Sequence, residues 1–178
     1  VMPDTVKAIH VSMNNFVNNQ SYIENLKGIN TVIVEAKNDE GSIFYDSNVC
    51  DEYLSDPDLA VGNTVVSKKE LKKIIKKYRK KGIYCVSRIV AFKDPVFAQE
   101  NPKESLTDKH DNLVVYNNQY WPSAYSRKAW MYNVAIAKEC ADLGFNEIQF
   151  DYVRFPDGTA TSEINLDFHN TYKESKVA

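Results

Sequence analysis

The sequence predicts an α/β fold, a parallel β/α barrel of which about the first four βα units are present. Strand-like apolar runs alternate with helical patterns, and this alternation is typical of parallel βαβ units. Each helix-to-strand connection is a few residues long, whereas the strand-to-helix connections at 38–67 and 92–125 are long. The long connections therefore lie at the carboxyl ends of the strands, where β/α barrels build their substrate sites.

The first three strands are expected to begin near Val6, Thr31 and Ile83, with helices between them at 21–26 and 68–81. The second helix carries an apolar stripe that predicts its buried face, formed by Leu71, Ile74, Ile75 and Tyr78. A glycine suited to the left-handed position at a helix end follows each of three helices: Gly28, Gly82 and Gly144.

The fourth strand follows Gly144 and stops shortly before Pro156, which cannot continue a central ladder. Its residues alternate, so we expect a buried strand with Ile148 and Phe150 on one face. Asp151 lies on the other face, at the carboxyl end of the strand. The pattern thus predicts an acid at the position where barrel enzymes carry their catalytic groups.

The segment 161–178 carries Ile164, Phe168 and Tyr172 at every fourth position, which predicts a fourth helix. We expect residues 1–178 to form a single domain, a partial barrel that belongs to a longer native chain. A partial barrel exposes two sheet edges, and exposed edges pair with other chains. The sequence therefore predicts a homodimer through these edges.

Strand parity predicts that polar side chains gather on one face of the sheet. The side chains assigned to this face are His10, Ser12, Glu35, Lys37, Arg88, Gln149 and Asp151. Charges are not buried without partners or purpose, and packed barrel interiors are usually filled by branched aliphatic residues. Two interpretations remain open: a substrate site, or an internal ion network in which the acids of this face pair with Lys37 or Arg88.

Aromatic residues crowd the third strand-to-helix connection. Because sugar rings present apolar C–H faces that stack on flat side chains, aromatic residues are typical of carbohydrate sites. Trp121 lies in a polar loop, and we predict that Trp121 and Tyr125 form a binding platform. Trp130 is instead expected to pack its helix on the sheet, together with Tyr132.

Three segments carry a family resemblance: VIVEAKNDEG at 32–41, GIYCVSRIVAFKDP at 82–95 and EIQFDYVRFP at 147–156. Through them the chain resembles, from Val6 to about Gly158, the putative glycosyl hydrolase domain of bacterial, often cell-envelope, proteins. That family looks like a branch of the barrel glycoside hydrolases. The chain departs from its pattern at Glu35, where the family often has Asp, and after Trp121, where an Asp-Pro pair is absent.

The resemblance implies a glycoside hydrolase that acts on a poly- or oligosaccharide, at the cell envelope or outside the cell. Such hydrolysis generally uses one ionised and one protonated carboxyl group. By resemblance Asp151 is the nucleophile or stabiliser, and the proton donor is left unassigned. The predicted catalytic residues are Asp151, Glu35 and Arg154, and the predicted substrate-binding residues are Arg88, Lys37, His10, Trp121, Tyr125 and Gln149. Arg154 and Arg88 are expected to hold Asp151 ionised or to bind sugar hydroxyls.

Two other functions remain open. The first is a non-catalytic domain for glycan binding or envelope assembly that keeps the barrel without the chemistry. The second is a sugar-phosphate lyase or isomerase that uses Lys37 as a Schiff-base or proton-transfer residue.

Composition indicates a globular domain, with 43% hydrophobic residues and a formal net charge of −2, and nothing suggests a nucleic-acid surface. Charge is uneven, since 68–81 holds nine basic residues and one acid and so carries +8. This segment fits a solvated helix face, or a surface for an anionic wall polymer or a membrane. No cofactor is predicted, and the spacing of the three cysteines supports no metal site. No apolar run is long enough to span a membrane.

Overall fold

The protein is described by a computed structural model that covers residues 2–158 and 166–175. The strands are β1 (Ala8–Ser12), β2 (Thr31–Lys37), β3 (Ile43–Tyr45), β4 (Val61–Val66), β5 (Tyr84–Val90) and β6 (Glu147–Asp151). The helices are α1 (Met13–Asn18), α2 (Gln20–Glu24), α3 (Cys50–Tyr53), α4 (Lys68–Lys80), α5 (Pro95–Glu100) and α6 (Arg127–Leu143). Short 3-10 turns cover Pro57–Ala60 and Pro102–Glu104.

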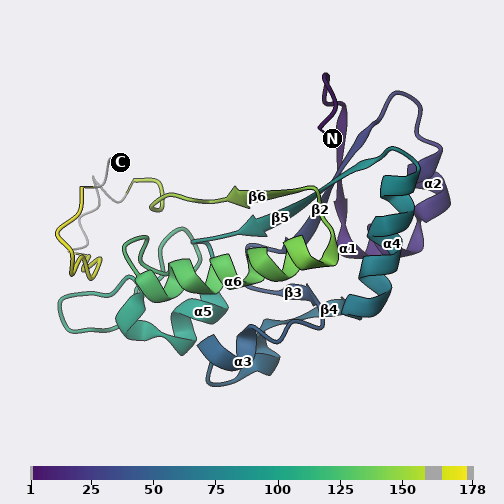
Figure 1. The fold of residues 1–178 in the computed structure, drawn as a ribbon. Helices are drawn as coiled ribbons and strands as arrows, with labels where there is room; N and C mark the ends of the chain where they lie inside the picture. Colours follow the sequence, from purple (N-terminus) through teal and green to yellow (C-terminus); the bar gives the residue numbers. More distant parts are fainter. Residues whose placement is uncertain (1, 159–165, 176–178) are drawn as a thin grey trace.

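The four predicted strands form a parallel set in the order β1, β2, β5, β6 (Figure 1). Helices alternate with these strands along the chain, as the sequence predicted. In residues 2–158 and 166–175, β1 and β6 are the outer strands of this set, and the sheet does not close on itself. The fold is therefore an open α/β sheet, and the homodimer through its edges stays a prediction.

The helices α4 and α6 begin and end as their sequences predict. The Ser67 side chain accepts a hydrogen bond from the amide of Glu70 at 3.2 Å, so Ser67 caps the start of α4. The predicted stripe of α4 is buried, with Leu71 and Ile75 at 0% exposure. α6 ends at Gly144, whose φ of 103° is the left-handed conformation that favours glycine.

The core lies between the sheet and these helices. Aromatic rings join its parts: Tyr78 of α4 stacks on Phe16 of α1 with ring centres 4.7 Å apart. On the other side of the core, Tyr132 of α6 lies 5.3 Å from Phe97 of α5. The predicted packing of Tyr132 against the interior is thus confirmed, with 1% of this residue exposed.

The two long connections contain regular structure that the sequence pattern did not reveal. The first holds β3, α3 and β4, and β3 pairs antiparallel with the end of β2 through Ile43 and Lys37. Glu139 of α6 fastens this connection, since its carboxylate accepts hydrogen bonds from the Tyr45 hydroxyl at 3.0 Å and the Ser47 hydroxyl at 2.5 Å. The second connection holds α5 and then runs irregularly to α6.

Two predictions about the end of the chain are wrong. Residues 166–175 form turns and a single bridge between Asp167 and Thr107 in place of a helix, so Phe168 and Tyr172 have no helical spacing. Ile164 lies outside the described residues. The strand β6 is not buried, because no strand covers its outer edge within the described part of the chain, and 42% of Phe150 is exposed.

Candidate functional site

The register of the parallel strands aligns polar residues on the face turned away from α4 and α6. Ser12 pairs with Glu35, Glu35 with Arg88, and Arg88 with Gln149. His10 and Asp151 lie two residues from this row on their own strands, and side chains two apart share a face. The predicted gathering of these six side chains on one face therefore holds.

Arg88 joins the two predicted strand-end carboxylates. Its Nη1 donates to Glu35 Oε1 at 2.8 Å, and its Nε and Nη2 donate to Asp151 Oδ2 at 2.9 and 2.6 Å. The side chain of Arg88 is 14% exposed, that of Glu35 28% and that of Asp151 41%. Asp151 is thus the most accessible group of a charged cluster, which we call the Glu35–Arg88–Asp151 cluster.

The surroundings of Asp151 favour its ionised form. Partial desolvation acts to raise the pKa of Asp151, but hydrogen bonds from Arg88 and from the Tyr152 amide, at 2.7 Å to Oδ1, outweigh it. The pKa of Asp151 is therefore lowered, with a smaller contribution from His10. Tyr152 has a φ of 53°, which is uncommon for a residue with a side chain and turns the backbone directly after the carboxylate.

Arg88→Met is expected to raise the pKa of Asp151, because the guanidinium supplies most of the hydrogen bonds that lower it. In the wild-type protein the depressed pKa contributes stability that is present above the unfolded value and is lost as pH falls through the folded value. The acid side of the pH–stability profile should therefore flatten in the variant, below about pH 4. Carboxyl ¹³C titration by NMR measures the pKa directly.

Arg154→Met is the matched control for this titration. Arg154 Nη1 lies 2.9 Å from Asp157, so its removal should leave the pKa of Asp151 unchanged. An Asp151 pKa that moves equally in both variants would contradict the assignment of Arg88.

Arg154 itself does not face Asp151, contrary to its predicted role. Its guanidinium lies over the Tyr152 ring at 5.3 Å and pairs with Asp157. Arg154 lines an apolar groove of about 950 Å³ with Tyr125 and the exposed Trp130 of α6. Phe150 also lines this groove and alternates with Asp151 along β6, so the groove lies on the opposite side of the sheet from the cluster. Tyr125, which was predicted to form a sugar-binding platform with Trp121, therefore lies at this groove and not beside the cluster.

Lys37 is also on the other side of the sheet. The register shifts between Glu35 and Lys37, so that Lys37 pairs with Ile89, which faces the core. This bulge turns the side chain into the interior, where 0% of it is exposed and Nζ lies 2.7 Å from Asp94 Oδ2. Nζ also donates to the Val90 carbonyl at 2.6 Å. Lys37 is thus a buried structural cation, and its predicted contact with substrate is wrong.

Trp121 is buried, although its loop is polar in sequence. Only 2% of it is exposed, its Nε1 donates to the Tyr116 carbonyl at 2.8 Å, and its ring centre lies 6.2 Å from that of Tyr152. A ring covered in this way has no free face for a sugar, so the predicted Trp121 platform is wrong. Trp121 instead supports the strained Tyr152 beside Asp151.

Trp121→Phe is expected to lower the free energy of unfolding by about 1–2 kcal/mol, because the Tyr116 carbonyl loses one of its two donors and the ring loses volume. Thermal unfolding measures the change. Trp130→Phe is the matched control: Trp130 is 37% exposed and its Nε1 donates to the Ala124 carbonyl at 2.7 Å, where water can replace it. Equal stability losses in the two variants would contradict the structural role of Trp121.

The structure adds two residues that the sequence pattern did not single out. Lys93 and Asp39 follow β5 and β2 and form an ion pair at 2.6 Å, and Lys93 lies over the Tyr152 ring at 5.1 Å. The hydrogen bond that Lys93 donates to the Asp39 carboxylate raises the pKa of Lys93. Their position directly after strand ends is the one signal in the sequence that could have marked them.

The three cysteines are interior residues. Burial raises the pKa of the Cys85 thiol to about 12 and that of the Cys140 thiol to about 11, so both remain protonated at neutral pH. Within residues 2–158 and 166–175, no group of three or more His, Cys, Asp or Glu side chains is arranged to hold a metal ion. In the same residues, no helix has the length and apolar character needed to cross a membrane.

Comparison with solved structures finds chains of similar fold. A hypothetical protein from Ruminiclostridium thermocellum is 27% identical, with a TM-score of 0.76 over 93% of this chain and 84% of that chain. A maltogenic α-amylase from Thermotoga neapolitana is 17% identical, with a TM-score of 0.57 over 82% of this chain and 38% of that chain. A GH20 exo-β-N-acetylglucosaminidase from Vibrio harveyi is 12% identical, with a TM-score of 0.62 over 89% of this chain and 29% of that chain.

The two enzymes are similar in fold alone, and the chain spans less than half the length of either. A comparison with curated proteins gives no match. The model of one protein family, described as putative glycosyl hydrolase domain, matches residues 6–178, which is nearly the whole chain. The three sequence segments that carry the resemblance lie within this match. Two of them supply the carboxylates of the Glu35–Arg88–Asp151 cluster, Glu35 and Asp151. The chain belongs to the putative glycosyl hydrolase domain family.

Proposed function

We propose that the chain is a glycoside hydrolase domain acting on a poly- or oligosaccharide, with Asp151 as the carboxylate that faces the reacting sugar carbon. One observation carries this proposal: an accessible carboxylate with a lowered pKa lies at the carboxyl end of a parallel strand and is oriented by an arginine. Barrel glycoside hydrolases build their sites at this end of the sheet, and the family assignment supports the same reaction class.

In this proposal Asp151 acts as nucleophile or as electrostatic stabiliser of an oxocarbenium-like transition state, which requires a negative charge. Arg88 holds Asp151 ionised and fixes its orientation through Nε and Nη2. Glu35 accepts from Nη1 and is a positioning residue for Arg88. The proton donor of the two-carboxylate mechanism is left unassigned.

Sugar hydroxyls would be bound by polar groups of the same face. Gln149 lies beside Arg88 in the register, and His10 lies on β1 close enough to contribute to the lowered pKa of Asp151. Tyr152 directly follows Asp151, and its ring contacts Lys93 and Arg154. We propose His10, Gln149 and Tyr152 as the substrate contacts, and a location at the cell envelope or outside the cell.

The first experiment is a screen for turnover with the full chain. The proteins of similar fold include an exo-β-N-acetylglucosaminidase and a maltogenic α-amylase. Chitooligosaccharides, maltooligosaccharides and purified peptidoglycan are therefore the first substrates to be screened. Release of reducing ends that disappears in Asp151→Asn supports the proposal. Release that persists in this variant contradicts it.

A glycan-binding domain without turnover is the second candidate. The specific observation in its favour is that Arg88 already satisfies both carboxylates of the cluster, as a stable internal ion network would. This candidate predicts that the same glycans bind in calorimetry without release of reducing ends, and that Asp151→Asn changes binding only slightly.

A further inference from the structure

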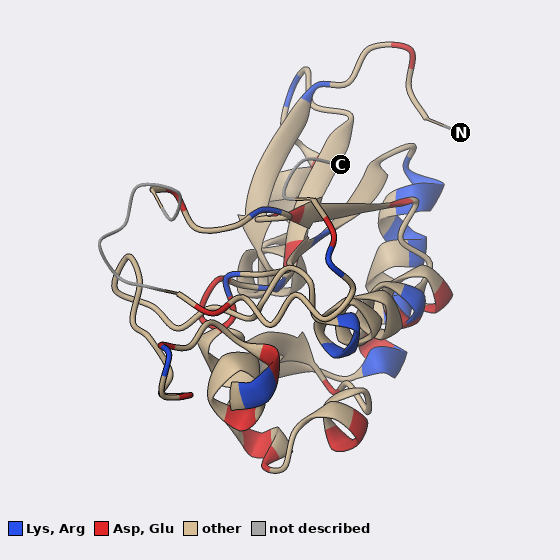
Figure 2. Cartoon of the chain, turned by 90° about the vertical axis from the view of Figure 1, so that its left-hand side faces the viewer, with Lys and Arg blue, Asp and Glu red and all other residues tan. Residues whose placement is uncertain are grey.

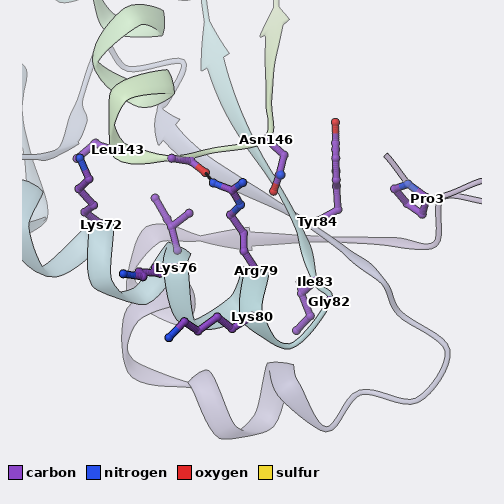
Figure 3. A pocket seen from close by; sticks show the side chains of 12 residues that line it. Pro3, Lys72, Lys76, Arg79, Lys80, Gly82, Ile83, Tyr84, Leu143 and Asn146 are labelled. Carbon is purple, nitrogen blue, oxygen red and sulfur yellow. Dashed lines mark hydrogen bonds between the residues drawn. The ribbon is translucent and has the colours of Figure 1, made fainter. Parts of the chain in front are cut away.

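A second groove lies at the opposite end of the sheet from the Glu35–Arg88–Asp151 cluster. It has a volume of about 570 Å³ and runs along α4, past the start of β5 and the end of α6. Figure 3 shows Lys72, Lys76 and Lys80 projecting from successive turns of α4 at this groove. Apolar side chains such as Ile83 and Leu143 line the remainder. The groove thus combines a row of cations with an apolar wall.

Of the lysines in and directly after α4, four have a carboxylate partner within the described residues, whereas Lys69 and the three groove lysines have none. Lys68 pairs with Glu139, Lys73 with Glu70, and Lys77 and Lys81 pair with Glu24. Within the described part of the chain, no carboxylate lies within ion-pair distance of the three groove lysines, which are exposed. Figure 2 shows Lys and Arg residues recurring along α4, and we call Lys72, Lys76 and Lys80 the groove stripe.

This stripe is unfavourable for the helix by itself. Lys72, Lys76 and Lys80 follow one another at i, i+4 spacing, and like charges at this spacing destabilise a helix by a few tenths of a kcal/mol per pair. Lys80 lies in the last turn, where the helix dipole favours a cation, but Lys72 and Lys76 lie too far from that end to benefit. A bound anion would remove the repulsion.

Arg79 closes the groove toward α6. Its Nη1 donates to the Gly144 carbonyl at 2.9 Å, which satisfies a group at the carboxyl end of α6. The negative end of that helix is therefore screened from the groove. The three lysines remain as point charges about 6 Å apart along the helix axis, from the rise of 1.5 Å per residue.

We propose that this groove binds a linear polymer whose units are joined by phosphodiesters, as a site separate from the carboxylate cluster. Evenly spaced single charges on flexible stems suit a chain of singly charged phosphates, whereas planar carboxylates favour the bidentate fork of arginine. The apolar wall suits the carbon backbone between the phosphates. The groove is recessed between α4 and α6, so a flat membrane surface would touch the lysines without filling it.

Single-stranded nucleic acid also carries regular phosphates, but its sites use several aromatic side chains on which bases stack. Tyr84 is the one aromatic residue among the described lining residues, and its hydroxyl donates to Glu147 at 3.1 Å. The groove therefore offers charge and an apolar wall without a row of stacking platforms.

The test is binding of poly(glycerol phosphate) to the full chain by calorimetry over a range of salt concentrations. The variant Lys72→Gln/Lys76→Gln/Lys80→Gln is expected to bind at least about tenfold more weakly at low salt. The slope of log K against log salt should fall in magnitude by about 2, because each phosphate contact of a single-stranded polyanion contributes about 0.7. Unfolding midpoints of all variants establish that they are folded.

The control variant Lys69→Gln/Lys73→Gln/Lys109→Gln removes the same charge from exposed positions outside the groove and should bind as the wild type does. An equal loss in the control would overturn the proposal, since net charge alone would then explain binding. Tighter binding to an oligothymidylate of equal phosphate number, or to phosphatidylglycerol vesicles alone, would also overturn it. Asp151→Asn should leave this binding unchanged, so the groove and the proposed hydrolase site are tested separately.

Discussion

Asp151→Asn is expected to reduce glycoside turnover by at least about a thousandfold, because the change removes the negative charge that the transition state requires. Asn keeps the shape of Asp and keeps an oxygen that can accept from Arg88. Sugar affinity should therefore change by only a fewfold. Initial rates with the best glycan from the screen, and calorimetry with the same glycan, measure the two effects independently.

Asp157→Asn is the matched control for this experiment. Asp157 is a second acid close in sequence, but it pairs with Arg154 on the side of the apolar groove. It should retain wild-type turnover. Loss of turnover in both variants would point to a general effect of charge or folding, and the role given to Asp151 would then be wrong.

Lys37→Met is expected to lower the free energy of unfolding by about 3–5 kcal/mol, which is the usual cost of breaking a buried ion pair from one side. The variant leaves the carboxylate of Asp94 in the interior without its cation. It also leaves the Val90 carbonyl and the Asn133 side-chain oxygen without the donor that Lys37 supplies. Urea denaturation followed by circular dichroism measures the loss.

The effect should extend to α5. Asp94 also caps this helix, since its Oδ1 accepts from the Phe97 amide at 2.8 Å. Lys37→Met/Asp94→Asn should recover part of the stability that Lys37→Met loses, because the double variant no longer buries an unpaired charge. A double variant that is as unstable as the sum of the single variants would contradict this coupling.

Lys93→Met provides the comparison at the surface. Lys93 and Asp39 form an ion pair of similar length, 2.6 Å, but 42% of the Asp39 side chain is exposed. Water can replace the lost partner there, so the expected loss is at most about 1 kcal/mol. A loss for Lys37→Met no larger than that for Lys93→Met would show that burial of the first pair carries no extra cost.

Local sequence pattern was sufficient to predict the parallel strands, the helix α4 and the residue at which α6 ends. These elements depend on interactions within a few residues: the Ser67 cap, the apolar stripe of α4 and the left-handed Gly144. Alternation along each strand likewise predicted that Glu35, Arg88 and Asp151 share a face. The prediction of a helix in the tail failed. A spacing of four among Ile164, Phe168 and Tyr172 also occurs in irregular segments that contacts with distant residues hold in place, such as the bridge of Asp167 with Thr107.

By itself, the sequence determined the family, the four parallel strands with α4 and α6 between them, and the face on which Asp151 lies. Only the tertiary structure decided which polar residues meet. A one-residue register shift sends Lys37 to the core, since side chains alternate with a period of two and a single extra residue reverses the face. Trp121 lies in a polar loop but is buried by segments that are distant in sequence, such as the one that carries Tyr152. Such contacts leave no local periodicity, so pattern alone predicts neither outcome.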